Sequence, residues 1–231
     1  MLHVLTPAEW EAVELSLRVG LWSTLLSVPP GFALAYLLAR GRFPGKVALD
    51  GLVHLPLVLP PVVTGYLLLL AFGRNGPLGQ LLDHVFGVTI AFRWTGAVVA
   101  SAVMSLPLLI RPMRLSIEAV DRKLEATART LGASRWDAFL SVTLPLSMPG
   151  VLAGAVLGFA RGLGEFGATI TFVSNIPGET RTLPLAIYTL LQVPGGEGQV
   201  LRLSVLAIVL AFVALIAAEL LARNLARRLQ G

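Results

Sequence analysis

The 231-residue sequence contains no cysteine. This absence excludes disulfides, thiolate metal sites, iron–sulfur clusters and cysteine nucleophiles. Histidine is also scarce, and His3, His54 and His84 have no spacing suited to zinc or haem ligation. We therefore expect this chain to bind no metal and no cofactor of its own.

Catalytic motifs are missing as well. The sequence has no Gly-x-Ser-x-Gly elbow, no His-Glu-x-x-His motif and no Walker-type phosphate loop. An intramembrane enzyme remains an alternative only through Arg161 and Glu165, because no other catalytic pairing is present. The chain cannot hydrolyse ATP by any of these motifs, so we expect any energy coupling to come from a partner.

Charged residues make up only 13% of the chain, whereas soluble domains carry roughly 25%. Hydrophobic residues make up 55%, and the mean hydropathy is +0.79. This composition predicts a small polytopic membrane protein. The net charge of +5 and the pI near 10.4 are then typical of basic cytoplasmic loops rather than of nucleic-acid binding.

Five segments are long and apolar enough to cross a bilayer, at residues 15–38, 52–72, 95–110, 144–173 and 203–221. Residues 174–202 contain three prolines and are predicted to form an external loop with a short helix at 185–192. An even number of spans with a short extra helix is the alternative. Either way, residues 1–231 are expected to form one transmembrane domain.

Most of the 18 basic residues lie on one side of these spans. They follow the first, third and fifth spans, at Arg40, Arg42, Lys46, Arg111, Arg114, Arg122, Lys123, Arg129, Arg135, Arg223, Arg227 and Arg228. The positive-inside rule predicts that these regions are cytoplasmic, with the N-terminus outside and the C-terminus inside.

Two spans contain residues that are unusual within a membrane. Pro60 and Pro61 predict a kink or break in the second span, with Thr64 and Gly65 just beyond it. In the fourth span, Arg161 and Glu165 are four residues apart and are expected to pair on one helix face, with Thr169 one turn further on. Ionisable residues in a membrane are costly, so the pair is either part of a pathway or gate, or a neutralised packing pair.

The basic segment 111–143 is patterned rather than flexible. Residues 118–130 have helical spacing, and Gly132 can take the left-handed conformation that ends a helix. Ser134 and Asp137 resemble a capping box that starts a second helix, Arg135–Leu140. That helix is predicted to present Trp136, Phe139 and Leu140 to the cytoplasm. This favours a protein docking site, with a helix lying in the membrane interface as the alternative.

The same segment resembles the EAA loop of ABC importer permeases. Glu125-Ala126-Thr127 matches the Glu-Ala-Ala start, with Thr127 in place of the second alanine, and Gly132, Leu144 and Pro145 follow at the family spacing. Residues 40–46, 55–65, 72–76, 160–169 and 175–188 are similar to the molybdate permease branch of that family.

The resemblance implies that this polytopic membrane protein is all-α, with a type I ABC importer permease fold of about five spans and a cytoplasmic coupling helix. Some relatives have an additional N-terminal span, for which this sequence has too few residues before Leu15. The implied assembly is a homodimer in the bacterial or archaeal cytoplasmic membrane, bearing two ATPase subunits that bind ATP and Mg. An external binding protein would deliver molybdate or tungstate. Lipid is an expected partner, and nucleic acid is not.

The resemblance also suggests roles for individual residues. We expect the coupling residues Glu125, Ala126, Gly132, Ser134, Arg135, Trp136, Asp137, Phe139 and Leu140 to contact or position the ATPase, with Trp136 and Phe139 as buried anchors. Glu125 is expected to hold the loop through Arg129 or a backbone donor, and Leu144-Pro145 to form a junction with the fourth span. Near the dimer axis, Pro60, Pro61, Thr64 and Gly65 are expected to approach Glu165, Phe166 and Thr169, with Arg161 neutralised by Glu165.

Two alternatives remain for the cargo and the mechanism. Sulfate permeases are close relatives, and sulfate is also a tetrahedral dianion. An autonomous secondary carrier is a weaker alternative, because internal repeats and unpaired buried carboxylates are not evident.

Overall fold

The computed structural model describes residues 5–230, and at positions 218, 221, 222 and 224–230 it describes the helix alone. Every regular element in that range is helical, which confirms the predicted fold class. The elements are α1 (Pro7–Arg40), α2 (Lys46–Val58), α3 (Pro61–Phe72), α4 (Pro77–Phe86), α5 (Trp94–Ala119), α6 (Arg122–Thr130), α7 (Arg135–Ala138), the π-helical turn η1 (Phe139–Thr143), α8 (Leu144–Leu163), α9 (Gly167–Val173), α10 (Leu183–Leu191) and α11 (Glu197–Gln230).

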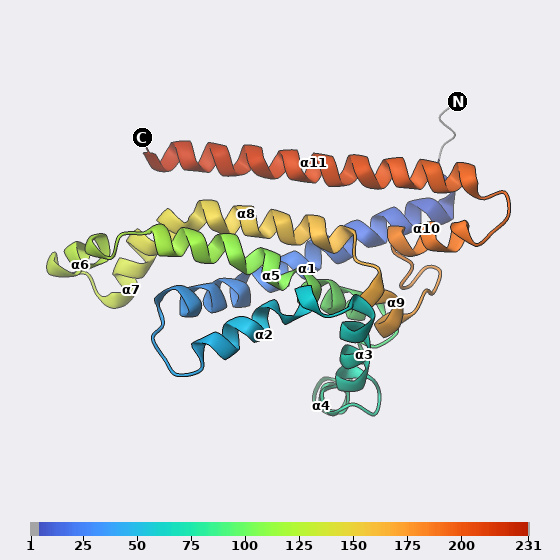
Figure 1. Cartoon of the computed structure of the whole chain (residues 1–231), viewed down its shortest axis with the longest axis horizontal. Helices are drawn as coiled ribbons and strands as arrows, with labels where there is room; N and C mark the ends of the chain where they lie inside the picture. The colour runs from blue at the N-terminus through green and yellow to red at the C-terminus, as the bar shows by residue number, and fades with distance from the viewer. Residues whose placement is uncertain (1–4, 231) are drawn as a thin grey trace.

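Helices α1, α5 and α8 pack side by side at the centre of the molecule, and α11 lies along α8 (Figure 1). Glycine permits the close approach of α5 and α8, because a Cβ at Gly154 would lie 2.3 Å from the Leu109 carbonyl oxygen. On α5, Leu109, Ile110 and Met113 are fully buried in this contact. Small residues at helix crossings are typical of membrane bundles, where close van der Waals packing drives association.

The two ends of this bundle differ. The segment after α1, the helices α6 and α7, and the end of α11 lie at one end of the long axis (Figure 1). The start of α1 lies at the other end, with α9 and α10 (Figure 1). The basic segments after α1 and α5 therefore gather at one end. Arg227 and Arg228, on which the predicted orientation also depends, lie outside the described side chains.

Within the described residues, four helical runs are long and apolar enough to cross a membrane: Pro7–Arg40, Trp94–Ala119, Arg135–Leu163 and Glu197–Ala217. The pair α2 and α3 makes a fifth if it counts as one broken span, and its two helices are bent by 115°. The bend lies at Pro60–Pro61, so the predicted break is confirmed. Proline supplies it because it lacks the N–H that would continue the helix.

Helices α1 and α5 extend beyond the spans that the sequence predicts within them. Helix α1 begins at Pro7 rather than near Leu15, because Thr6 and Glu9 form a capping box. Helix α5 continues past Ile110 to Ala119, so residues 111–119 are not loop.

The charges in that last part of α5 are paired. Arg114 Nη1 lies 2.9 Å from an Asp50 carboxylate oxygen on α2, and its Nε donates over 2.9 Å to Glu118. The predicted helix 118–130 is accordingly divided. Asp121 accepts from the Lys123 N–H and starts α6 as a separate helix.

The fourth predicted span is not continuous either. Helix α8 ends at Leu163 and α9 begins at Gly167, so Arg161 and Glu165 do not share one helix. The predicted short helix at 185–192 is confirmed as α10, and the predicted fifth span lies within α11. No prediction covered α4, whose first turn begins at Pro77.

Candidate functional site

The turn between α6 and α7 has the local structure that the sequence predicts. Gly132 has a φ of 99°, a left-handed conformation that residues with a Cβ rarely adopt. Ser134 and Asp137 form the predicted capping box, each side chain accepting from the other residue's backbone N–H over 3.1 Å. The left-handed Gly132 turns the chain after α6, and the capping box begins α7 at Arg135.

Helix α7 does not stop at a junction before Pro145. It continues through η1 into α8, so that Arg135–Leu163 is one uninterrupted helical run. The Leu144 N–H bonds to the Phe139 carbonyl, five residues back, which is the pattern of a π turn. Pro145 follows as the second residue of α8, and it lacks a backbone N–H to donate to the preceding turn. The predicted helix Arg135–Leu140 is therefore not separate from the fourth predicted span, and the predicted junction Leu144-Pro145 lies where η1 passes into α8.

Phe139 packs against α1 and Trp136. Its ring lies 6.1 Å from that of Phe32 and 5.3 Å from that of Tyr36, both on α1, and 5.9 Å from that of Trp136, all edge-on. Phe139 is only partly exposed, so the prediction of an exposed ring holds in part, with the rest of the ring packed against α1. Trp136 is 74% exposed, and Leu140 is also exposed.

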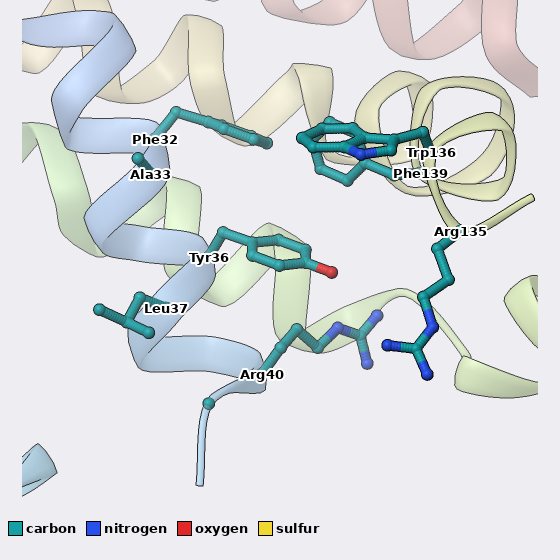
Figure 2. A pocket seen from close by; sticks show the side chains of 9 residues that line it. Phe32, Ala33, Tyr36, Leu37, Arg40, Arg135, Trp136 and Phe139 are labelled. Carbon is teal, nitrogen blue, oxygen red and sulfur yellow. The ribbon is translucent and has the colours of Figure 1, made fainter. Parts of the chain in front are cut away.

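An open groove of about 740 Å³ separates α1 from the start of α7. Figure 2 shows Phe32, Tyr36 and Phe139 on its aromatic side, with the guanidinium groups of Arg40 and Arg135 converging on its other side. The groove therefore combines an apolar wall with two cations next to the exposed Trp136.

Glu125 is held by partners that the sequence analysis missed. Arg40 Nη2 donates to its Oε1 over 3.0 Å, and the Thr143 hydroxyl donates to the same oxygen over 2.7 Å. The predicted partner Arg129 is wrong. Arg40 ends the first helix and Thr143 ends η1, so nothing in their local sequence indicates that they meet.

The second group of candidate residues lies where α3 packs against α9. A Cβ at Gly65 would lie 2.5 Å from the Ala168 carbonyl oxygen, and one at Gly167 would lie 2.7 Å from Pro61 Cβ. Thr64 and Thr169 are both buried in these helices, and Pro60 caps the start of α3. The structure thus brings together the broken parts of the second and fourth predicted spans.

Glu165 lies in the break between α8 and α9. Its Oε2 is 2.7 Å from Arg161 Nη1, and its Oε1 accepts from the Ala168 N–H over 2.9 Å. The Glu165 side chain is 2% exposed, and its one carboxylate both pairs with the partly exposed Arg161 and accepts from the first turn of α9. The neighbouring Phe166 contacts α10, where its ring lies 5.0 Å from that of Tyr188.

Comparison with known proteins agrees with this architecture. The family described as "Binding-protein-dependent transport system inner membrane component" matches residues 31–230. The chain belongs to this family. The permease fold that the EAA-like loop implies is thereby confirmed, as is the placement in an inner membrane.

Individual members of the permease family are close in sequence. The molybdenum transport system permease protein ModB of Escherichia coli (strain K12) is 59% identical over 220 residues, covering 95% of this chain and 96% of that protein. The sulfate transport system permease protein CysW of Synechococcus elongatus is 41% identical over 177 residues, covering 77% of this chain and 62% of that protein.

A solved structure shows the same permease fold. The crystal structure of a bacterial ABC transporter involved in the import of the acidic polysaccharide alginate matches with a TM-score of 0.71 and 19% identity, covering 98% of this chain and 82% of that chain. At this identity the match concerns the fold alone.

Proposed function

We propose that this chain is the permease subunit of an ABC importer for molybdate, with tungstate as an alternative cargo. The observation that carries this proposal is the 59% identity to the ModB permease over nearly the whole length of both proteins. The lower identity and coverage of the sulfate permease make sulfate the second candidate. The chain itself is not an enzyme in this proposal.

The proposed assembly contains two copies of this chain, two ATPase subunits and an external binding protein. ATP and Mg bind to the ATPase, and this chain binds neither. The exposed Trp136 and Leu140 support an ATPase contact at α7, since exposed aromatic side chains are typical anchors of protein interfaces. The continuous run from α7 to α8 supports rigid transmission of ATPase motion into the membrane.

The proposed pathway passes the contact of α3 with α9. Two broken helices meet there, which is typical of transporter substrate sites because the freed backbone groups can face the cargo. Pro60, Pro61, Thr64, Gly65, Phe166 and Thr169 are the proposed pathway or gate residues. Arg161 is paired with Glu165, so a passing dianion would meet hydroxyl and backbone donors instead of a strong fixed cation that could trap it.

We also propose that the end of the molecule bearing α6 and α7 is cytoplasmic. This orientation follows the positive-inside rule and places the start of α1 outside and the end of α11 inside. Tags fused at the two chain ends should then lie on opposite membrane faces in a protease-protection assay. Protection of both tags from the same side would contradict this orientation.

The function is tested by uptake into proteoliposomes that contain this chain with its ATPase. Uptake should require ATP and loaded binding protein, and molybdate and tungstate should compete for it more strongly than sulfate. Stronger competition by sulfate would favour the sulfate permease alternative. Uptake without the ATPase would favour a secondary carrier.

A further inference from the structure

Three elements that are far apart in the sequence meet at one carboxylate. Glu125 on α6 accepts from Arg40 at the end of α1 and from Thr143 at the end of η1. The same Arg40 Nη2 also donates to the Val120 carbonyl, 2.9 Å away, just after α5. Arg40 and Glu125 therefore connect α1, α6, η1 and the end of α5.

This is not an exposed surface pair of little consequence. The Arg40 side chain is only 11% exposed, and its Nε is buried without a hydrogen-bond partner. The Thr143 side chain is fully buried. A largely buried cation depends on its partner carboxylate, because removal of one partner leaves the other charge uncompensated in a poorly solvated position.

The position of this contact matters for transmission of motion. Helix α7 continues through η1 into α8 as one helical run. No such helical run joins α7 to α1, so α7 is linked to α1 through side-chain contacts. The aromatic contacts of Phe139 with Phe32 and Tyr36 are apolar and lie across an open groove. The only ion pair between α1 and segment 120–143 in the described part of the chain is Arg40–Glu125.

We propose that Arg40 is a positioning residue for energy coupling, acting through Glu125 and Thr143. The inference rests on the proposed ABC importer function. With the contact intact, motion imposed on α7 by the ATPase moves α1 and α8 together. Without it, α1 loses its direct contact with α6 and η1, and motion of α7 reaches α1 only through the packing of α1 against α5 and α8. The ATPase subunit then hydrolyses ATP with a smaller matching movement of α1.

The π turn fits this role. Its last residue, Thr143, donates to the carboxylate oxygen that Arg40 also contacts, so the turn and α1 share one acceptor. Turns of this kind are rare in proteins and occur often at functional sites. A shift of η1 relative to α1 would break one of the two hydrogen bonds.

The test measures ATP hydrolysis and uptake by the reconstituted complex with Arg40→Gln, Glu125→Gln and the charge exchange Arg40→Glu/Glu125→Arg. The quantity of interest is the ratio of hydrolysis with loaded binding protein to hydrolysis without it. Retention of the ATPase subunit during purification is measured alongside. Arg129→Gln is the matched control, since Arg129 lies one turn from Glu125 on the exposed side of α6.

We expect both single variants to retain the ATPase subunit, while the stimulation ratio and uptake fall about fivefold or more, the range of a typical coupling free energy. The charge exchange should recover part of both, and Arg129→Gln should match the wild type. Because loss of Arg40 could impair folding, Thr143→Val provides a milder second variant. It removes one hydrogen-bond donor, and Thr127→Val on the exposed side of α6 is its control.

If Arg40→Gln and Thr143→Val both keep the stimulation ratio of the wild type, the inference is overturned. The proposed function still stands in that case, provided that the wild-type complex takes up the oxyanion. Loss of the ATPase subunit from Arg40→Gln with no recovery in the charge exchange would also overturn it, because Arg40 would then act in docking. A wild-type complex that takes up no oxyanion would overturn the proposed function, and the inference with it.

Discussion

Replacement of Gly65 by alanine tests how closely α3 must approach α9. A Cβ at this position would lie 2.5 Å from the Ala168 carbonyl oxygen, 2.8 Å from Thr171 Cβ and 2.9 Å from Ala168 Cα. Two of these three atoms belong to the backbone of α9, so no side-chain rotation relieves the clash. Ordinary contact begins at 3.4 Å, so α3 would have to move away by about 0.9 Å.

The free-energy cost of the clash at position 65 can be separated from the gain in helix propensity that alanine brings. Forced overpacking of this kind costs about 1–3 kcal/mol, whereas glycine to alanine within a helix gains up to about 1 kcal/mol. Gly51 on α2 is the matched control, because a Cβ there meets nothing within 4 Å. Both variants gain the same propensity, so the difference in stability between them isolates the clash.

We expect Gly65→Ala to unfold about 2–12 °C below Gly51→Ala in detergent, from about 2–4 °C per kcal/mol for a chain of this size. Uptake by Gly65→Ala should also fall, because displacement of α3 moves Thr64 relative to Thr169. Gly51→Ala should transport as the wild type does. Equal unfolding temperatures and equal uptake for the two variants would refute the close contact of α3 with α9.

Three further substitutions test the proposed pathway and coupling residues. Glu165→Gln should reduce transport without changing the affinity of the separate binding protein for its ligand, because it leaves Arg161 without its counterion; normal uptake would assign the pair a packing role only. Trp136→Ala should release the ATPase subunit or abolish its stimulation. Trp10 is also exposed but lies near the start of α1, so Trp10→Ala should do neither. Stable complexes with stimulated ATP hydrolysis in both variants would contradict docking at α7. Gly132→Val should abolish uptake while membrane insertion persists, since a β-branched residue at φ 99° is strained by roughly 1–2 kcal/mol, and wild-type uptake would show that the turn tolerates another conformation.

Features that depend on neighbouring residues could be predicted from the sequence. The break at Pro60–Pro61, the left-handed Gly132 and the Ser134–Asp137 capping box all follow from the backbone chemistry of one or a few residues. The membrane character of the chain follows from composition alone. The EAA-like loop could be located for the same reason, since its residues are contiguous in the sequence.

Helix bounds near charges could not be predicted, because they depend on distant partners. Arg114 appeared to belong to a loop, yet Asp50 pairs with it and allows α5 to continue to Ala119. The reverse holds for Glu165, where helical spacing predicts one continuous helix. Its carboxylate caps α9 in the structure, and so the helix is interrupted.

The sequence by itself determined that this chain is an all-helical membrane protein with a patterned basic loop, because apolar runs, prolines and caps act locally. Only the tertiary structure decided which residues hold that loop. Arg40 and Glu125 are 85 residues apart, and Phe139, which begins a π turn that no local pattern indicated, packs against Tyr36 on α1. Such contacts arise where helices pack, and their geometry depends on the whole bundle rather than on any one segment of the sequence.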